Sequence, residues 1–392
     1  MDPRDLAAHL ERRRDEFIDD LSEMVNTDSG SFSPSGVNRV ADLCEERFSA
    51  GGWDVERRPH EPGPGRDRLG DLLVGRLAGA ARPRILMIGH MDTVFPDGTA
   101  SERPFTIDGT RAKGPGVSDM KSGLLFGFFA ADALREARAE IGSLTYVCNP
   151  DEEIGSPFSG PIIKELASSA DVALVLESAR GNGDIVSARK GVSDVLIEIM
   201  GKAAHAGVEP ESGRSAILEA AHKTIAVHDL NGRWPGVTVN VGVIGGGTRP
   251  NVVPDGCTMQ VDVRSPEEPT LAEAEAEIRR ICESSTVEGT TAVAEVRRWH
   301  RPMEKSEGTA KLVDLARQTA GELGFEVRDT VTGGASDANT TAAAGVPTLD
   351  GLGPVGGGDH GPDEWMDLDS LVPRSAMLAS LIERCGAIGG GP

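Results

Sequence analysis

Three short apolar runs in the first half of the chain each lead directly into side chains that can bind a metal ion or move a proton. These side chains are His90 and Asp92 after the first run, Glu152 and Glu153 after the second, and Glu177 after the third. Imidazole nitrogens and carboxylate oxygens are common ligands of zinc and other divalent ions. Two such ions about 3.5 Å apart, bridged by one carboxylate, suit this set of donors.

Two further residues extend the set. Asp119 follows the loop 114–118 and precedes an expected helix, and His360 lies in a glycine-dense loop. Together with the residues at the strand ends they give a candidate cluster of two histidines and three carboxylates. Taken singly, Asp119 can also be a helix N-cap and His360 a turn residue. The combination of residues is therefore stronger evidence for a metal site than either residue alone.

Asp92 and Glu152 fit supporting roles beside the ligands. In an extended segment, residues i and i+2 point the same way, so Asp92 can hydrogen-bond one nitrogen of His90 while the other binds a metal ion. At a corner where a strand becomes a loop, Glu152 and Glu153 can both face a cleft, one as a ligand and the other as a general base. Nearby carboxylates and apolar walls raise the pKa of such a base. The plainer alternatives are a surface loop and a solvated acidic turn.

The elements that position these residues follow from the hydrophobic pattern. Nearly continuous apolar runs are typical of strands buried on both faces. Such strands are expected at residues 84–88, 143–148, 171–176 and 345–349. Helices are expected at residues 6–25, 37–50, 121–137, 310–323 and 368–385. The alternation predicts an α/β domain with a mostly parallel sheet and helices on both faces, and sites in such sheets form beyond the carboxyl ends of the strands.

The pattern changes in the middle of the chain. Strands are expected there at residues 192–200, 236–244, 257–264 and 291–299, and helices at 214–228 and 271–283. This β-α-β-β-α-β order predicts a ferredoxin-like, split-βαβ domain with an edge strand or helix face open for pairing. The predicted organisation is a catalytic domain of residues 1–189 and 302–392, interrupted by a lid or dimerisation domain of residues 190–301.

Composition narrows the class of partner. The chain has 392 residues, of which 62 are acidic and 40 basic, and its net charge is −22. This balance argues against binding nucleic acid or anionic lipid, and no apolar run approaches the roughly 20 residues of a membrane span. The five cysteines are scattered without C-x-x-C spacing. They predict free, buried thiols in a cytoplasmic protein, and the first residues have no signal-peptide core.

The joint occurrence of these residues resembles metallopeptidase family M20, and within it the glutamate carboxypeptidase branch. The matching segments are 89–94, 114–121, 151–156, 201–207, 249–254 and 332–337, with Glu177 and His360. They extend over nearly the whole chain, and their combination is highly specific.

The resemblance implies a centre with two divalent metal ions, zinc first, with cobalt or manganese as alternatives. The implied ligands are His90, Asp119 and Glu177 for one ion, and Asp119, Glu153 and His360 for the other. The family also usually has a cis peptide bond after the bridging aspartate, which here joins Asp119 to Met120.

The resemblance also implies roles around the centre. Glu152 is the implied general base, which takes a proton from the attacking water and passes it to the leaving amine, and Asp92 orients His90. His205 is expected to bind the oxyanion of the tetrahedral intermediate across a homodimer formed by the lid domains. The substrate carboxylate is expected to contact Asn251, Arg264 and Arg301.

The implied reaction is hydrolysis of the amide bond of an N-acyl amino acid or short peptide, with release of the C-terminal amino acid. Glutamate-specific members carry a lysine and an arginine where this chain has Ile185 and Val331, so strict glutamate specificity is not expected. The alternatives are an aminoacylase or desuccinylase of the same family, and a non-catalytic family member that acts as a binding protein.

Overall fold

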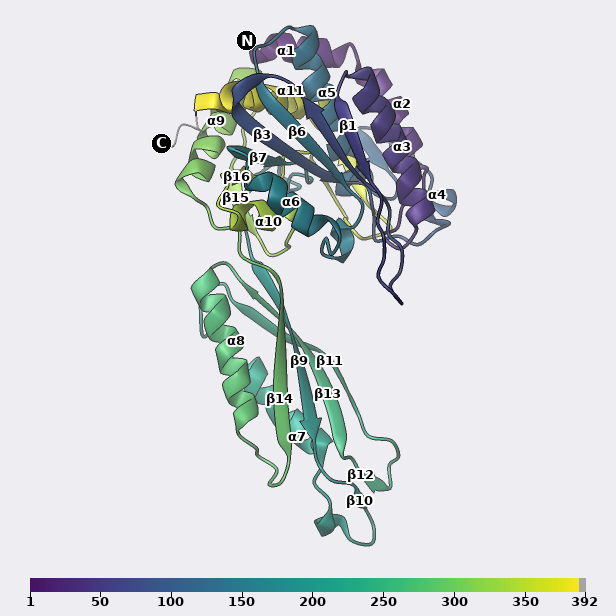
Figure 1. Ribbon diagram of the computed structural model, residues 1–392, viewed down its shortest axis with the longest axis vertical. Helices are drawn as coiled ribbons and strands as arrows, with labels where there is room; N and C mark the ends of the chain where they lie inside the picture. Colours follow the sequence, from purple (N-terminus) through teal and green to yellow (C-terminus); the bar gives the residue numbers. More distant parts are fainter. Residues whose placement is uncertain (388–392) are drawn as a thin grey trace. The chain divides into compact units, whose positions relative to one another are not determined.

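The computed structural model describes residues 1–387, and these divide into two compact units (Figure 1). The first unit contains residues 1–187, 305–331 and the described residues from 336 onward. The second contains residues 188–304 and 332–335. The chain therefore builds one unit, leaves it for the other, and returns. Within residues 1–387, no helix has the length and apolar character needed to cross a membrane.

The first unit is built on a six-stranded mixed sheet. Its strands, in spatial order, are β1 (Asp54–Arg58), β2 (Leu72–Leu77), β6 (Gly142–Asn149), β3 (Ala80–His90), β7 (Val172–Val175) and β16 (Thr348–Leu349). The pairs β6–β3, β3–β7 and β7–β16 are parallel, whereas β1–β2 and β2–β6 are antiparallel. The predicted parallel core is present, and two antiparallel strands that the sequence pattern did not reveal extend it on one side.

Both faces of this sheet are buried. In β3, Ile85 and Met87 belong to the large hydrophobic core, and the alternate residues Leu86 and Ile88, which point to the opposite face, are also buried. Helix α5 (Ser122–Glu136) packs against β3, while α10 (Asp337–Ala343) packs against β7 and against α6 (Ser159–Ala167). The α/β class predicted from the sequence is confirmed.

The first unit contains further helices. They are α1 (Pro3–Glu11), α2 (Arg14–Val25), α3 (Pro34–Ala50), α4 (Thr99–Glu102), α9 (Glu307–Leu323) and α11 (Leu371–Arg384). The prediction of one helix over residues 6–25 is wrong. The backbone of Arg13 leaves the helical conformation, with φ −105° and ψ 10°. Its guanidinium instead binds Glu16 and Asp132, which lies on α5.

Small sheets occupy the loops around this core. The strands β17 (Gly356–Gly357), β18 (Trp365–Asp367), β5 (Arg111–Lys113) and β4 (Thr106–Asp108) form one sheet in that order. A two-stranded sheet joins β8 (Ile185–Arg189) to β15 (Asp329–Thr332). All five cysteines are free and buried, as their spacing predicted.

The second unit has the predicted β-α-β-β-α-β order. Its elements are β9 (Gly191–Met200), α7 (Ala216–His228), β11 (Thr238–Gly246), β13 (Gly256–Ser265), α8 (Glu268–Glu283) and β14 (Thr291–His300). The sheet order is β11-β13-β9-β14, and all pairs are antiparallel. Alternate residues of β9, such as Val195 and Ile197, pack with α7 and α8 in a separate core.

Two details of the second unit matter below. A short ribbon pairs β10 (Ala204–His205) with β12 (Val252–Val253). Where the chain enters and leaves the unit, Arg189 and Met303 face each other, and each backbone N–H donates to the carbonyl of the other at 3.0 Å.

Candidate active site

The carboxyl ends of three neighbouring strands bring the predicted ligands of the first unit together. His90 is the last residue of β3, and Glu177 follows shortly after the end of β7. Glu152 and Glu153 lie in the 3-10 turn Glu152–Ile154 that follows β6. Because β6, β3 and β7 are parallel, these ends meet at one edge of the sheet.

The donor atoms form two groups that share Asp119. His90, Asp119 and Glu177 make up one group, and the other contains Asp119, Glu153 and His360; within each group the donor atoms lie within 4.8 Å of one another. Nε2 of His90 is 3.0 Å from Oδ1 of Asp119, and Nε2 of His360 is 3.3 Å from its Oδ2. The two carboxylate oxygens of Asp119 therefore face different groups.

These distances fit a pair of divalent cations. Ligands placed tetrahedrally about 2.0–2.1 Å from zinc lie roughly 3.3 Å from one another. Nε2 of His90 is 3.7 Å from Oε1 of Glu177, and Nε2 of His360 is 3.1 Å from Oε2 of Glu153. The donors are nitrogen and carboxylate oxygen, which divalent transition metals accept. Spacing and chemistry are both suitable for the ions that the sequence predicts.

Asp92 fixes the orientation of His90. Nδ1 of His90 lies 2.9 Å from the backbone carbonyl of Asp92, which can only accept, so Nδ1 carries the proton and Nε2 is free to bind a metal ion. The Asp92 carboxylate is fully buried and accepts hydrogen bonds from Ser31 Oγ at 2.7 Å and from the N–H groups of Glu152 and Glu153 at 3.1 and 3.2 Å. Asp92 thus contacts the histidine through its backbone carbonyl and both glutamates through its carboxylate.

Asp119 is held by a residue that the sequence analysis missed. The buried carboxylate of Glu364 accepts hydrogen bonds from the backbone N–H groups of Gly116, Ser118 and Asp119, at 2.9, 2.8 and 3.0 Å. Burial raises the pKa of Glu364 to about 7, although these hydrogen bonds oppose the rise. The peptide bond between Asp119 and Met120 is cis, as the resemblance implied. Glu364 lies in an acidic loop, and its spacing gave no signal.

A second buried carboxylate supports the loop that carries Glu152. Asp337 accepts hydrogen bonds from Asn149 Nδ2 at 2.5 Å and from Ser156 Oγ at 2.6 Å, on either side of the glutamate turn. Asp151 in turn accepts the backbone N–H of Phe158 at 2.6 Å, near the start of α6. The turn between β6 and α6 is therefore fixed at several points.

Glu152 belongs to neither group of donors, but it lies next to them. Its Oε2 is 4.0 Å from Nε2 of His90. Burial raises the pKa of Glu152 well above its usual range; His90 opposes this rise, and the negative charge of Glu177 adds to it. Hydrogen bonds to Asp119 and Glu153 raise the pKa of His360 to about 11. A divalent cation beside these side chains would lower both pKa values.

The predicted residues of the second unit fall into two places. His205 and Asn251 lie together at the β10–β12 ribbon, where the N–H of Ala206 donates to the carbonyl of Asn251 at 3.0 Å. His205 is exposed, and the N–H of Gly207 donates to its Nδ1 at 3.1 Å, which leaves the ring proton on Nε2.

Arg264 lies at the other end of β13. It is eight positions from Gly256, the residue next to the ribbon, which corresponds to about 26 Å along a strand. Its Nε is 3.0 Å from Oδ1 of Asp262, and Nη1 donates to the carbonyl of Gly333 at 3.0 Å. Arg301 is exposed just after β14. A single chain therefore does not bring Asn251 and Arg264 to one carboxylate.

Ile185 and Val331 stand where glutamate-specific family members are expected to carry basic residues. Ile185 is buried in the core of the first unit, and Val331 is exposed. Neither side chain can pair with a second substrate carboxylate.

Comparison with known proteins places these features in a family. The family model for peptidase family M20/M25/M40 matches residues 86–384. Carboxypeptidase G2 from Pseudomonas sp. (strain RS-16) is 30% identical over 377 residues, 94% of this chain and 89% of the relative. An acetylornithine deacetylase from Proteus mirabilis is 26% identical over 398 residues, 94% of this chain and 96% of that protein. Among solved structures, aminopeptidase PepT from Bacillus cereus superimposes with a TM-score of 0.79 at 26% identity, covering 95% of this chain and 98% of its own.

Proposed function

The chain belongs to peptidase family M20/M25/M40, and on this premise we propose that it hydrolyses the amide bond of N-acyl amino acids or short peptides and releases the C-terminal amino acid. The observation that carries the proposal is the sharing of Asp119 between two donor groups with Glu152 beside them. The similarity to a carboxypeptidase over most of the chain supports the same reaction class.

In this proposal the first unit is the catalytic domain. His90, Asp119 and Glu177 would hold one divalent ion, and Asp119, Glu153 and His360 the other; zinc is proposed, with cobalt or manganese as alternatives. When bound, such ions polarise the scissile carbonyl and lower the pKa of water toward about 7.

Glu152 moves the proton. Its carboxylate accepts a proton from the attacking water and later delivers it to the nitrogen of the leaving amino acid. A general base works best when its pKa is near the working pH, and burial of Glu152 already raises its pKa from the usual range of a glutamate. Asp92 keeps the base and His90 in fixed relation, because it binds the N–H of Glu152 and lies next to the ring of His90.

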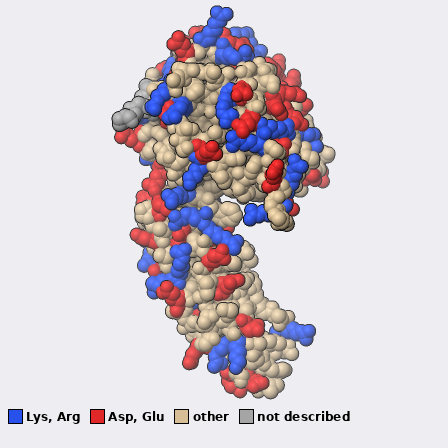
Figure 2. Space-filling view, viewed as in Figure 1, with Lys and Arg blue, Asp and Glu red and all other residues tan. Residues whose placement is uncertain are grey.

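The second unit supplies substrate-binding groups in a homodimer. Its edge strand β11 presents Val243 and Ile244 to solvent, and the neighbouring α7 presents Ile217, Leu218 and Ile225. An unpaired edge strand beside exposed apolar side chains is suited to pairing with a second copy. Figure 2 shows few Lys, Arg, Asp or Glu side chains over the part of this unit that contains β11 and β13.

Dimerisation would also give His205 and Asn251 a role. Both lie at the end of the sheet opposite to the residues where the chain enters and leaves the unit. We propose that Nε2–H of His205 donates to the oxyanion at the site of the partner subunit, and that Asn251 binds substrate there. Arg264 and Arg301 would bind the substrate carboxylate.

The test is turnover by the metal-loaded protein with a panel of N-acyl amino acids, dipeptides and N-succinyl amines. We expect release of a free amino acid from the first two classes. Glu152→Gln should keep the bound metal, measured by elemental analysis, and lose several orders of magnitude in kcat, whereas Glu165→Gln on the exposed face of α6 should behave as wild type. Turnover restricted to N-succinyl amines would favour a desuccinylase, and near-normal turnover of Glu152→Gln would exclude the assigned base.

A further inference from the structure

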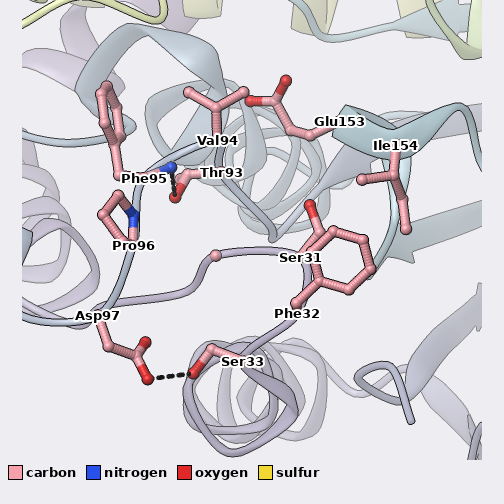
Figure 3. A pocket seen from close by; sticks show the side chains of 11 residues that line it. Ser31, Phe32, Ser33, Thr93, Val94, Phe95, Pro96, Asp97, Glu153 and Ile154 are labelled. Carbon is pink, nitrogen blue, oxygen red and sulfur yellow. Dashed lines mark hydrogen bonds between the residues drawn. The ribbon is translucent and has the colours of Figure 1, made fainter. Parts of the chain in front are cut away.

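An open groove lies beside the second donor group of the first unit. It has a volume of about 450 Å³, and Figure 3 shows the side chains that line it. They come from the segments 30–33 and 93–97 and from Glu153 and Ile154. Glu153 is a member of the group with Asp119 and His360, so the groove opens at the proposed reaction centre. Its volume falls within the range of roughly 300–1,000 Å³ that is usual for ligand pockets.

The walls of the groove are mostly apolar and partly exposed. Phe32 is 66% exposed and Val94 41% exposed, and Phe95, Pro96 and Ile154 complete the apolar lining. Single exposed apolar side chains are ordinary, but several that line one concave surface mark a binding site. Figure 3 shows Phe32 and Ile154 among the side chains that line the groove.

The two segments that form the groove hold each other in place. The N–H of Thr93 donates to the carbonyl of Ser29 at 2.9 Å, and the N–H of Ser31 donates to the carbonyl of Thr93 at 3.2 Å. Ser33 Oγ donates to Oδ2 of Asp97 at 3.0 Å. A Cβ at Gly30 would lie 2.5 Å from the carbonyl oxygen of Phe95, so the close approach of the segments requires glycine. These contacts fix the two segments that line the groove relative to each other.

The charged side chains along the groove disfavour the binding of an anion. Its charged lining residues are Asp97 and Glu153, and the lining set includes no lysine or arginine. A carboxylate binds where cationic donors can pair with it. The carboxylate end of the substrate does not suit this surface, whereas an uncharged acyl group does.

We propose that this groove binds the acyl side of the substrate and makes the enzyme selective for uncharged aromatic or large aliphatic acyl groups. The inference rests on the proposed amidohydrolase function and specifies its substrate class. Phe32 and Val94 are the specificity-determining residues, because they are large apolar side chains of the lining that are exposed.

The test compares kcat/KM for the N-phenylacetyl and N-acetyl derivatives of one amino acid on the zinc-loaded enzyme. A filled apolar pocket discriminates by about tenfold or more, so we expect at least that preference for N-phenylacetyl. Phe32→Ser should reduce the preference by about tenfold, mainly through a lower kcat/KM for the N-phenylacetyl substrate. The matched control is Ile107→Ser on β4, which is 49% exposed and outside the groove; it should keep the full preference.

The possible outcomes distinguish failure of the groove proposal from failure of the proposed function. Hydrolysis of both substrates with no preference, or with a preference that Phe32→Ser does not alter, overturns the groove proposal and leaves the function standing. A faster reaction with N-succinyl than with the size-matched N-pentanoyl substrate overturns it as well. If neither substrate is hydrolysed, the function fails, and saturation-transfer NMR with phenylacetamide still decides about the groove. A signal that Phe32→Ser abolishes supports it, and absence of a signal with wild type overturns it.

Discussion

Oε1 of Glu364 accepts a hydrogen bond from the backbone N–H of Asp119 at 3.0 Å, although the two residues are 245 positions apart in the chain. The carboxylate shared by both donor groups is thus positioned by a side chain that belongs to neither group. Together with the N–H groups of Gly116 and Ser118, this bond fixes the loop that precedes Asp119.

Replacing Glu364 should weaken metal binding. Without its carboxylate, three backbone N–H groups lose their acceptor and Asp119 loses its fixed position. Groups that hold metal ligands in place typically contribute about 10–100-fold in affinity, and we expect a loss of that size in Glu364→Ala, measured by competition with a zinc chelator. Glu364→Gln keeps one acceptor oxygen and should recover part of the loss. The exposed neighbour Asp363 offers the control Asp363→Ala; equal affinities in all variants would contradict the role.

Asp92→Asn should reduce turnover while the protein stays folded. The amide would turn an NH2 group toward Ser31 or toward the N–H groups of Glu152 and Glu153, all of which donate to this side chain. We expect kcat/KM to fall by about 100-fold. Asp108→Asn, an exposed residue that pairs with Lys113, is the control for loss of one negative charge. Wild-type kinetics in Asp92→Asn would show that the contacts of this carboxylate with Ser31, Glu152 and Glu153 do not position the site.

Mixing two inactive variants should restore activity if His205 acts across a dimer. A Glu152→Gln subunit keeps His205, and a His205→Ala subunit keeps Glu152, so their heterodimer contains one complete site in a two-fold dimer. After joint refolding we expect up to about a quarter of wild-type activity, from random pairing of subunits.

A variant at the proposed dimer interface is the control for this mixing experiment. The substitution Ile225→Lys in both subunits places a charge on a residue of α7 that is 62% exposed, and it should give monomers by light scattering and no restored activity. Restoration that is independent of the oligomeric state, or none in a proven dimer, would argue that His205 does not act in trans.

The stability of the first unit should contain a pH-dependent contribution from Glu16. Arg13 donates to both of its carboxylate oxygens, at 2.8 and 2.9 Å, and Arg47 donates at 2.8 Å. Hydrogen bonds from Arg13, opposed by partial burial and reinforced by Arg47, lower the pKa of Glu16 to about 2. A carboxylate with a lowered pKa in the folded state stabilises the protein above its unfolded pKa of about 4.3, and this contribution is lost as the pH falls toward 2.

Glu16→Gln should therefore lower the free energy of unfolding at pH 7 by about 0.5 kcal/mol, because the group is partly exposed and screened. Urea unfolding at pH 7, 5, 4 and 3 should show the difference from wild type shrinking only below about pH 5. Glu23→Gln, an exposed position on the same helix, should show a smaller difference. A difference that stays constant over the whole range would assign the effect to packing.

How far the sequence predicts the site depends on what each residue does. His90, Glu153 and Glu177 were predicted because they follow buried strands, whose apolar runs stand out in the sequence. Glu364 and Asp337 were not assigned as supports of the site, because they bind backbone and side-chain groups of distant loops and such contacts leave no periodic signal.

In the fold, too, elements with a local sequence pattern were predicted, whereas elements that depend on contacts with distant residues were not. The parallel strands have continuous apolar runs and were predicted, whereas β1 has the sequence DVERR, with one apolar residue, and only its pairing with β2 makes it a strand. The break between α1 and α2 was missed for a similar reason. Residues 6–25 keep a helical pattern, and the break depends on Arg13 reaching Asp132 on another helix.

The reciprocal hydrogen bonds between Arg189 and Met303 mean that the two ends of the inserted segment lie side by side. Ends that are adjacent are what allows a domain to be inserted into a loop of another, because the host chain needs no extra length to close the gap. The whole insert can thus be exchanged as a module: a short turn in its place would reconnect the host chain. In this architecture, changes in the inserted unit and changes at the carboxyl edge of the sheet in the first unit are separable events.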